Sequence, residues 1–567
     1  MMTRARTALR SKAIAAVVAA GVALLLAGCV GIPSSGPVEK GDALATTDDI
    51  DIIFQPSGPG VDESQEDILG GFIRAALNPL NNFAVARSFL SASFADSWKP
   101  DSGVTIDQSG RTTTVLSDTS IDLALTPIAT VDGNGEYATV PAAPPVSRSY
   151  TFIQEDGQWR INSAPDGIVM LSSEFSEVYN SYPLYFYDPS YSRLVPDVRW
   201  FPRVASSTGT RIARALVSGP SAWLGAAVAT AFPEGTGVTS VPVDSGVASV
   251  DLSGPVLDAT AVTLSRMQVQ LRASLGQLSG VSSVRMTVDS TEVPLQTAAD
   301  AAPFPSPRVD SRALVLRSGQ FGFFTGSSLT PIEGISDDVV GLDARSIAYS
   351  DSVPGLTLAA VGTPAGVYAV APNTTPGLID DRANLIQPSI DPDGFVWTVP
   401  AGSPRDVRVT AAGRTPASFT ATWDGASQIV SLDVSRDGAR VLAFLTMDGQ
   451  PRLVIASVLR DKDGVPTGLG EPVDLSEGAG TAVDATWVDS LSVASVTRTA
   501  SGDNAVVQQQ IGGITTQLSD ASNIVGLVGS NDVVGLRALG ADGTILQQSA
   551  NTWQVRAAGV QLLATQY

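Results

Sequence analysis

The position of the single cysteine constrains this chain most strongly. Among 567 residues the only cysteine is Cys29, directly after Leu26-Ala27-Gly28 at the end of an apolar run over residues 13–27. Basic residues and no acidic ones precede this run, an order typical of a bacterial export signal. As a helix the run would cover only about 22 Å, less than the ~30 Å hydrocarbon layer, which favours a cleaved signal over a membrane span. The rest of the chain is therefore expected to fold outside the cytoplasm without any disulfide.

The order Leu26-Ala27-Gly28-Cys29 also resembles the lipobox of bacterial lipoproteins. The resemblance implies that the Cys29 sulfur receives a diacylglyceryl group, that the chain is cut before Cys29 and that the new N-terminus is acylated. Several acyl chains, at about 0.8 kcal/mol per buried CH₂, hold a protein stably on a membrane. We expect residues 1–28 to be the lipoprotein signal peptide and the mature chain to be anchored at the extracytoplasmic face of the cell membrane. The alternatives are a plain secretory signal with an incidental cysteine and an uncleaved anchor helix.

The composition after the signal peptide excludes several kinds of chemistry. Histidine is absent, which removes Ser-His-Asp catalysis, histidine–zinc sites and imidazole proton relays. With Cys29 assigned to lipid, thiol catalysis and cysteine–metal sites are excluded as well. The mature chain has 31 Lys and Arg against 56 Asp and Glu, a net charge of −25, so repulsion from phosphates makes a nucleic-acid partner unexpected. These facts favour a binding protein with no enzyme activity, no cofactor and no metal.

Residues 29–61 are expected to form a flexible tether. They are rich in Gly, Pro, Ser and acidic residues, and about thirty such residues have an r.m.s. span of roughly 30 Å. No later stretch reaches 18 apolar residues, so no further membrane span is expected. The folded body can therefore stand away from the membrane.

The first folded part, residues 62–178, is predicted to be an α+β domain. Ile68, Phe72 and Ala76 recur at helical spacing, and a second short helix is expected over residues 83–90. After residue 100 the pattern changes to alternating strands with Asp-Gly turns. Helices followed by a curled antiparallel sheet resemble the cone-shaped domains of the nuclear-transport-factor-like superfamily, whose sheet often forms a pocket.

The second part, residues 182–298, carries a more specific pattern. The spacing predicts strands over residues 184–187 and 195–200, a helix over 210–218, a hairpin over 238–252, a long helix over 264–278 and a last strand over 284–288. Several short motifs in this order resemble the GerMN module of germination proteins and actinobacterial lipoproteins. They are Tyr185-Phe186, Leu194-Val195-Pro196, Gly219-Pro220, Phe232-Pro233-Glu234-Gly235-Thr236, Val250-Asp251-Leu252-Ser253 and Gly280-Val281-Ser282-Ser283-Val284.

The third part, residues 305–567, is predicted to be an all-β propeller. The segment 390–397 aligns with 434–441, 44 residues later, and similar units begin near residues 342 and 485. Apolar strand, Asp-Gly turn and apolar strand at this spacing match the period of a four-stranded blade. The length corresponds to about six blades, and a pair of β-sandwiches is the structural alternative.

The whole order of modules resembles the LpqB family of actinobacterial lipoproteins along essentially the entire mature chain. In that family the resemblance implies an accessory of the MtrAB two-component system, whose partner is the extracytoplasmic domain of the sensor kinase MtrB. It also implies an influence on signalling to cell-envelope functions. The alternatives are an envelope protein that binds wall polymer without any kinase and a carboxylate-dependent propeller hydrolase.

Four groups of charged residues are candidate sites with simpler explanations. Asp391-Pro392-Asp393-Gly394 starts like a calcium loop, but Phe395 and Gly402 stand where ligands are needed, so a hairpin turn is expected. Asp337-Asp338 and Asp380-Asp381 are interpreted as solvated loop charges. The last group holds four arginines that either bind an anionic polymer or acidic loop or lie on an exposed face: Arg199, Arg203, Arg211 and Arg214.

Overall fold

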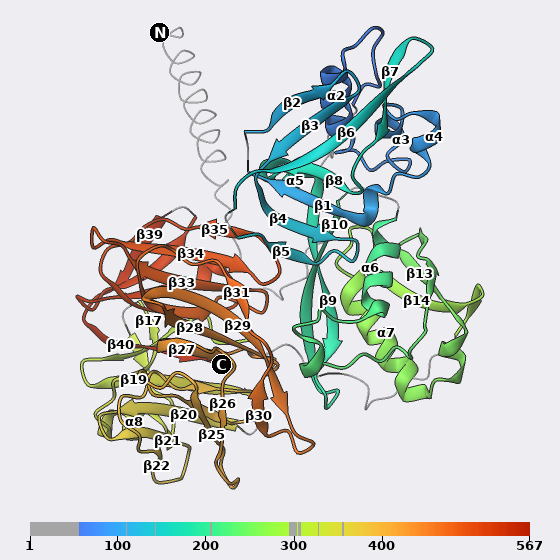
Figure 1. Ribbon diagram of the computed structural model, residues 1–567. Helices are drawn as coiled ribbons and strands as arrows, with labels where there is room; N and C mark the ends of the chain where they lie inside the picture. Colours follow the sequence, from blue (N-terminus) through green and yellow to red (C-terminus); the bar gives the residue numbers. More distant parts are fainter. Residues whose placement is uncertain are drawn as a thin grey trace, which may run out of the picture. The chain divides into compact units, whose positions relative to one another are not determined.

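The computed structural model describes residues 56–108, 110–141, 143–203, 207–293, 303, 308–326, 328–353, 356–550 and 552–567. Cys29, the expected signal peptide and residues 29–55 of the expected tether lie outside these residues. The described residues belong to one compact unit, drawn in colour in Figure 1. Among the helices described, none is long and apolar enough to cross a membrane.

The first domain begins with a helix that its sequence predicts well. Ser64 caps the helix by accepting from the Asp67 amide, and the Asp67 carboxylate accepts from the Ser64 amide in return. Ile68, Leu69 and Phe72 are buried at the predicted helical spacing. The elements of the domain are α2 (Gln65–Ala75), α3 (Ala84–Arg87), α4 (Ala92–Ala95), η1 (Pro100–Ser102), β1 (Gly103–Asp107), β2 (Thr112–Ser117), β3 (Ser120–Leu125), β4 (Pro127–Asp132), β5 (Tyr137–Thr139), β6 (Val146–Glu155), β7 (Gln158–Ser163), β8 (Ile168–Leu171) and α5 (Ser172–Val178).

Two four-stranded sheets form the rest of this domain, in the orders β5-β4-β1-β8 and β2-β3-β6-β7. Strand β1 pairs parallel to β8, and the remaining neighbours pair antiparallel. Trp98 packs against Phe72, with ring centroids 5.0 Å apart, and Tyr150 closes the same cluster. The cavity beside Phe72 and Tyr150 holds only about 20 Å³, so large side chains fill this part of the interior.

The second domain confirms the predicted succession of two strands, a helix, a hairpin, a long helix and a last strand, and it shows that the first two strands pair with each other. Its elements are β9 (Tyr179–Tyr187), β10 (Leu194–Pro202), α6 (Thr208–Ser218), η2 (Gly225–Ala227), β11 (Val238–Ser240), β12 (Val243–Asp244), β13 (Val247–Leu252), η3 (Gly254–Asp258), α7 (Ala261–Leu275), β14 (Ser283–Val288) and β15 (Thr291–Glu292). Helix α7 crosses over between the parallel strands β13 and β14, and it packs against β9, β14 and α6 (Figure 1). Its buried face includes Met267, Leu271 and Leu275.

The third domain is a β-propeller, as its sequence period predicts. Its strands are β16 (Ala313–Arg317), β17 (Gln320–Thr325), β18 (Ser328–Thr330), β19 (Ser346–Val353), β20 (Leu356–Thr363), β21 (Gly366–Val370), β22 (Gly377–Asp380), β23 (Ser389–Ile390), β24 (Val396–Thr398), β25 (Asp406–Thr410), β26 (Ala417–Thr420), β27 (Ala426–Val434), β28 (Arg440–Met447), β29 (Gln450–Arg460), β30 (Pro466–Leu469), β31 (Val473–Leu475), β32 (Thr481–Trp487), β33 (Ser492–Arg498), β34 (Asn504–Gln510), β35 (Thr515–Gln517), β36 (Ile524–Val528), β37 (Arg537–Gly540), β38 (Ile545–Ser549), β39 (Thr552–Ala557) and β40 (Val560–Gln566). Two short helical segments, α8 (Ser336–Gly341) and η5 (Val533–Gly535), lie between strands.

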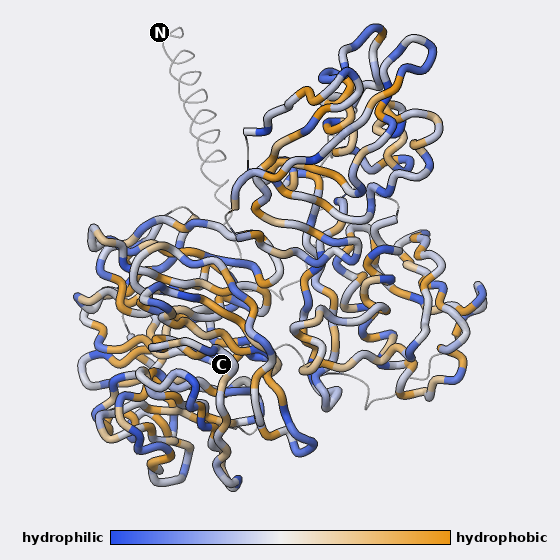
Figure 2. Tube along the Cα trace, viewed as in Figure 1, coloured by the Kyte–Doolittle hydropathy of each residue, from blue (hydrophilic) through white to orange (hydrophobic). Residues whose placement is uncertain are grey.

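Within the described residues these strands form six blades. Four blades are separate sheets that begin at β23, β27, β32 and β36. The other two, β18-β17-β16-β40 and β19-β20-β21-β22, join into one eight-stranded sheet because β40 also pairs parallel to β19. The last strand thus completes the blade that the first propeller strands begin, which closes the ring. Many strands of the propeller are rich in hydrophobic residues (Figure 2). Successive residues of β28 and β33 are buried, as expected where each blade packs against neighbours on both faces.

The 44-residue repeat corresponds to the first hairpin of successive blades. Residues 390–397 form the β23–β24 hairpin, and residues 434–441 form the matching β27–β28 hairpin. The units near residues 342 and 485 lead into the β19–β20 and β32–β33 hairpins. The predicted turn at Asp391-Pro392-Asp393-Gly394 is confirmed, with Gly394 at φ 82° where a side chain would be strained.

Two expectations about acidic pairs are wrong in part. Asp380 is 2% exposed rather than solvated, and it forms ion pairs with Arg382 at 2.7 Å and Arg408 at 3.1 Å. Burial alone would raise the pKa of the Asp380 carboxyl, but hydrogen bonds from Arg382 and Thr398 hold that pKa below its usual value. Asp337 and Asp338 lie in the first turn of α8 instead of in a loop, where the helix dipole favours carboxylates.

Candidate functional site

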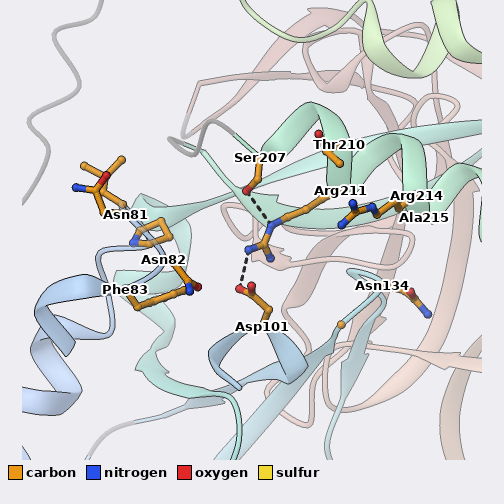
Figure 3. Close-up of a pocket in the computed structure, with 13 residues that line it drawn as sticks. Asn81, Asn82, Phe83, Asp101, Asn134, Ser207, Thr210, Arg211, Arg214 and Ala215 are labelled. Carbon is orange, nitrogen blue, oxygen red and sulfur yellow. Dashed lines mark hydrogen bonds and ion pairs between the residues drawn. The ribbon is translucent and has the colours of Figure 1, made fainter. Parts of the chain in front are cut away.

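A cleft of about 730 Å³ lies along α6, between the first and second domains (Figure 3). Helix α6 forms one side, and the segments before α3, in η1 and between β4 and β5 form the others. This volume falls in the range of small-molecule sites. The lining residues are Pro79, Leu80, Asn81, Asn82, Phe83, Asp101, Gly133, Asn134, Ser207, Thr210, Arg211, Arg214 and Ala215.

Helix α6 places its two arginines at the cleft because its other face is buried. Ile212, Ala213 and Leu216 pack into the core of the second domain. Residues three apart share a helix face, so Arg211 and Arg214 project together, as their spacing predicts. The helix stops at Gly219, which has φ 106° and precedes a proline.

The two arginines are held in different ways. Arg211 donates through Nη2 to Asp101 Oδ1 at 2.6 Å and through Nε to Ser207 Oγ at 3.3 Å (Figure 3). Arg214 donates through Nε to Val238 O at 3.1 Å and through Nη2 to Thr239 O at 3.0 Å. Among the described residues, Arg214 therefore bonds to neutral carbonyls and to no carboxylate.

The facing wall has an unusual backbone. Asn81, Asn82 and Phe83 follow one another in the left-handed region, with φ 51°, 57° and 59°. Only glycine adopts this region freely, and asparagine tolerates it better than bulky residues do. Phe83 is buried against Trp98, with ring centroids 6.1 Å apart, while both asparagines stay exposed at the cleft. The packing of Phe83 thus holds a segment that turns two amides outward.

The sequence placed four arginines together, and the structure separates them. Arg211 and Arg214 line the cleft, and exposed Arg203 donates to Ser176 O at 3.2 Å. The expectation of an exposed face is wrong for Arg199, which is 1% exposed on β10. Arg199 pairs instead with Asp197 at 2.7 Å and with Glu136 of the first domain at 3.0 Å.

A second cavity, of about 370 Å³, lies where the three domains meet. Trp200 of β10 donates through Nε1 to Gly512 O of the propeller at 2.9 Å. The same ring packs 4.9 Å from Phe175 and 6.0 Å from Tyr137 of the first domain. Burial raises the pKa of Glu136 at this junction, although the neighbouring Arg199 acts in the opposite direction.

Acidic side chains on the innermost propeller strands connect neighbouring blades. Asp484 accepts from Ser431 Oγ of the preceding blade at 2.6 Å and from the Leu527 amide of the following blade at 2.7 Å. Asp433 accepts from Thr486 Oγ1 of the following blade at 3.0 Å. It also accepts from Oη of Tyr567, which follows β40, at 2.7 Å. Burial raises the pKa of Asp484 to about 6 and also raises the pKa of Asp433. These carboxyls hold the ring together.

The buried acid of the Asp391 turn is likewise occupied by protein donors. Arg460 Nη2 donates to Asp391 Oδ2 at 2.7 Å, and the Trp397 indole donates to the same oxygen at 3.2 Å. Among the described residues, no group of three or more acidic, cysteine or histidine side chains is placed to hold a metal ion. The carboxylate therefore stabilises the turn and accepts hydrogen bonds from Trp397 of β24 and Arg460 of β29.

These features define a multi-domain protein in which two α+β domains are attached to a closed propeller. Three family models match successive parts of the chain. They are "Lipoprotein LpqB, N-terminal domain" at residues 58–176, "Sporulation and spore germination" at 183–294 and "Lipoprotein LpqB beta-propeller domain" at 319–561. The chain belongs to the LpqB family of lipoproteins.

Relatives with the name Lipoprotein LpqB support this assignment, some over nearly the whole chain and others over about half of it. The protein of Rhodococcus opacus is 26% identical over 97% of this chain and 96% of its own length. The proteins of Cutibacterium acnes and Thermobifida fusca are 32% and 30% identical over 50% of this chain, and the chain spans about half of their length, 48% and 47%.

Two solved structures that match parts of this chain have low TM-scores and low identity. TolB from Acinetobacter baumannii is 16% identical with a TM-score of 0.33, covering 45% of this chain and 66% of that chain. The tandem GerMN domains of the sporulation protein GerM from Bacillus subtilis are 14% identical with a TM-score of 0.18, covering 34% of this chain and 59% of that chain.

Proposed function

We propose that this chain is a lipid-anchored, non-catalytic interaction protein at the extracytoplasmic face of the cell membrane, where it binds and modulates the sensor kinase MtrB. Membership of the LpqB family supports the proposal, because the resemblance to that family implies an accessory of the MtrAB two-component system. The anchor is the lipid on Cys29, and the partner is the extracytoplasmic domain of the kinase.

The observation that carries the proposal is the junction at Trp200. One strand of the second domain packs its indole ring on the first domain and bonds the propeller through the same ring. Arg193 of the second domain adds an ion pair to Asp393 of the propeller at 2.9 Å. Modules joined in this way present one continuous surface, which suits a protein that holds a partner in a defined orientation.

Anchoring both proteins to one membrane reduces the affinity that this surface needs. Confinement converts binding into a nearly intramolecular event and raises the effective concentration. A dissociation constant of about 1 μM in solution, which corresponds to about −8 kcal/mol, is therefore sufficient.

Site-specific photo-crosslinking in cells tests the proposal. A crosslinking amino acid is placed at one exposed apolar position of each domain: Val115 (58% exposed), Leu257 (67%) and Val534 (59%). Irradiated cells should give an MtrB conjugate from at least one position, and the same strains without irradiation are the control. Deletion of the protein should also change phosphorylation of the response regulator. Crosslinks to wall polymer alone, with unchanged phosphorylation, would falsify the kinase assignment and favour an envelope-binding role.

A further inference from the structure

The cleft along α6 carries a positive charge in a strongly acidic chain. Among the described residues that line it, Arg211, Arg214 and Asp101 are charged, which gives a net charge of +1, whereas the whole chain has −21. Arg211 is balanced by Asp101, so the excess charge belongs to Arg214. This arrangement favours a ligand that brings one negative group.

Arg214 is prepared to bind an oxyanion. Its bonds to Val238 O and Thr239 O orient the guanidinium through Nε and Nη2 without neutralising it, and they leave Nη1 free of protein bonds among the described residues. A planar guanidinium with an open edge makes strong charge-assisted hydrogen bonds to carboxylate or phosphate oxygens. A charge that the protein orients and does not cancel is a feature of a binding site.

The remaining lining is suited to a neutral, hydroxyl-rich body. Asn81, Asn82 and Asn134 bring amide groups, and all three residues are exposed at the cleft. An amide both donates and accepts, although Asn82 Oδ1 already accepts from Arg87 Nη2 at 3.5 Å. Pro79 and Leu80 add an apolar patch beside them. Sugar rings present hydroxyl groups at their edges and C–H groups on their faces, so they match both kinds of surface.

We propose that this cleft binds a saccharide unit that carries a single carboxylate or phosphate group, with Arg214 on the oxyanion and the asparagine amides on the ring hydroxyls. The volume of about 730 Å³ accommodates such a unit. A polyanion is disfavoured because the acidic chain as a whole repels it. This ligand site is independent of the kinase partner.

Calorimetric titration of the mature chain, prepared without its lipid, tests the site with four probes: glucuronate, glucose 1-phosphate, glucose and inorganic phosphate. At least one charged sugar should bind tenfold or more tightly than glucose, and the two charged probes distinguish a carboxylate from a phosphate ligand. Binding should weaken with added salt. Binding of no probe, binding of glucose as tight as that of the charged sugars, or binding of phosphate as tight as that of the tighter charged sugar overturns the proposal.

Matched variants locate the site. Arg214→Gln should weaken binding of the charged sugar at least tenfold while leaving glucose binding unchanged. Arg203→Gln removes another exposed arginine, outside the cleft, and should leave all affinities unchanged. Melting temperatures of both variants should equal that of the parent chain, since both side chains are exposed. Equal losses in the two variants, or no loss in Arg214→Gln, refute the assignment.

Discussion

Replacing Asp391 by alanine tests the energetic role of the buried propeller turn. Asp391 is 0% exposed, and its carboxylate accepts hydrogen bonds from four donors. Its Oδ1 accepts from the Asp393 amide at 3.0 Å and the Phe395 amide at 2.9 Å. Its Oδ2 accepts from Trp397 Nε1 at 3.2 Å and Arg460 Nη2 at 2.7 Å. Alanine removes all four acceptor contacts and leaves the guanidinium of Arg460, 10% exposed, without its closest acid.

The expected loss is about 4 kcal/mol. Breaking a buried ion pair by removing one partner costs about 3–5 kcal/mol. Arg460 retains bonds to Gly464 O and Gly438 O and a longer contact with Asp393 at 3.4 Å. The loss of the ion pair should therefore cost about 3 kcal/mol, the lower end of this range. The orphaned Trp397 indole adds about 1 kcal/mol or more. For a domain of this size, about 2–4 °C per kcal/mol gives a fall in melting temperature of about 8–16 °C.

Asp393→Ala is the matched control, because Asp393 lies two residues away and is 34% exposed. Its ion pair with Arg193 is partly exposed on the Asp393 side and should contribute about 1 kcal/mol. Both variants are compared with the parent chain by thermal and urea unfolding, with calcium and with a chelator. Equal losses in the two variants would refute the buried-acceptor reasoning. A calcium-dependent rise in the melting temperature that Asp391→Ala abolishes would restore the calcium-loop alternative.

Three further predictions concern the anchor, ring closure and pH. Cys29→Ala should abolish labelling by a fatty-acid analogue, and a labelled variant would exclude Cys29 as the attachment site. Deleting residues 560–567 removes β40, so the propeller should lose its cooperative thermal transition, whereas an unchanged transition would exclude closure by β40. Because the pKa of Asp484 is raised to about 6 from about 3.9 when unfolded, its stabilising contribution is complete below pH 4 and declines as pH rises through 6. Between pH 4 and 7 the urea midpoint of Asp484→Asn should change less with pH than that of the parent chain. An equal change in both proteins would contradict the raised pKa of Asp484.

Local periodicity accounts for the part of the fold that the sequence predicts. Helix α2, helix α7 and the first hairpins of successive blades follow from spacings of a few residues, which one segment contains by itself. The parallel pairing of β1 with β8 was not predicted. Its partners, such as Val104 and Ile168, lie far apart in sequence and produce no shared local pattern.

In the candidate site, too, local spacing predicts some residues, whereas contacts between distant segments determine the others. Arg211 and Arg214 follow from helical spacing, but Asp101 pairs with Arg211 from 110 residues away. The left-handed segment at Asn81 has only a weak local signal, two asparagines in succession. The burial of Arg199 has no local signal in the sequence, since one of its two acidic partners, Glu136, belongs to another domain.

The structure changes what the net charge implies about partners. Counting charges treats every arginine as a surface cation, yet Arg199 and Arg440 are each 1% exposed and paired with acids, and Arg460 is 10% exposed. The two charges of each buried pair cancel each other. The acidic excess therefore remains on the surface, where fewer arginines are left to balance it. A protein partner should therefore approach with a basic surface, and its association should slow with added salt. Arg214 lies at a cleft and has no ion pair among the described residues, so in this acidic chain it attracts an anionic group that the remaining surface repels.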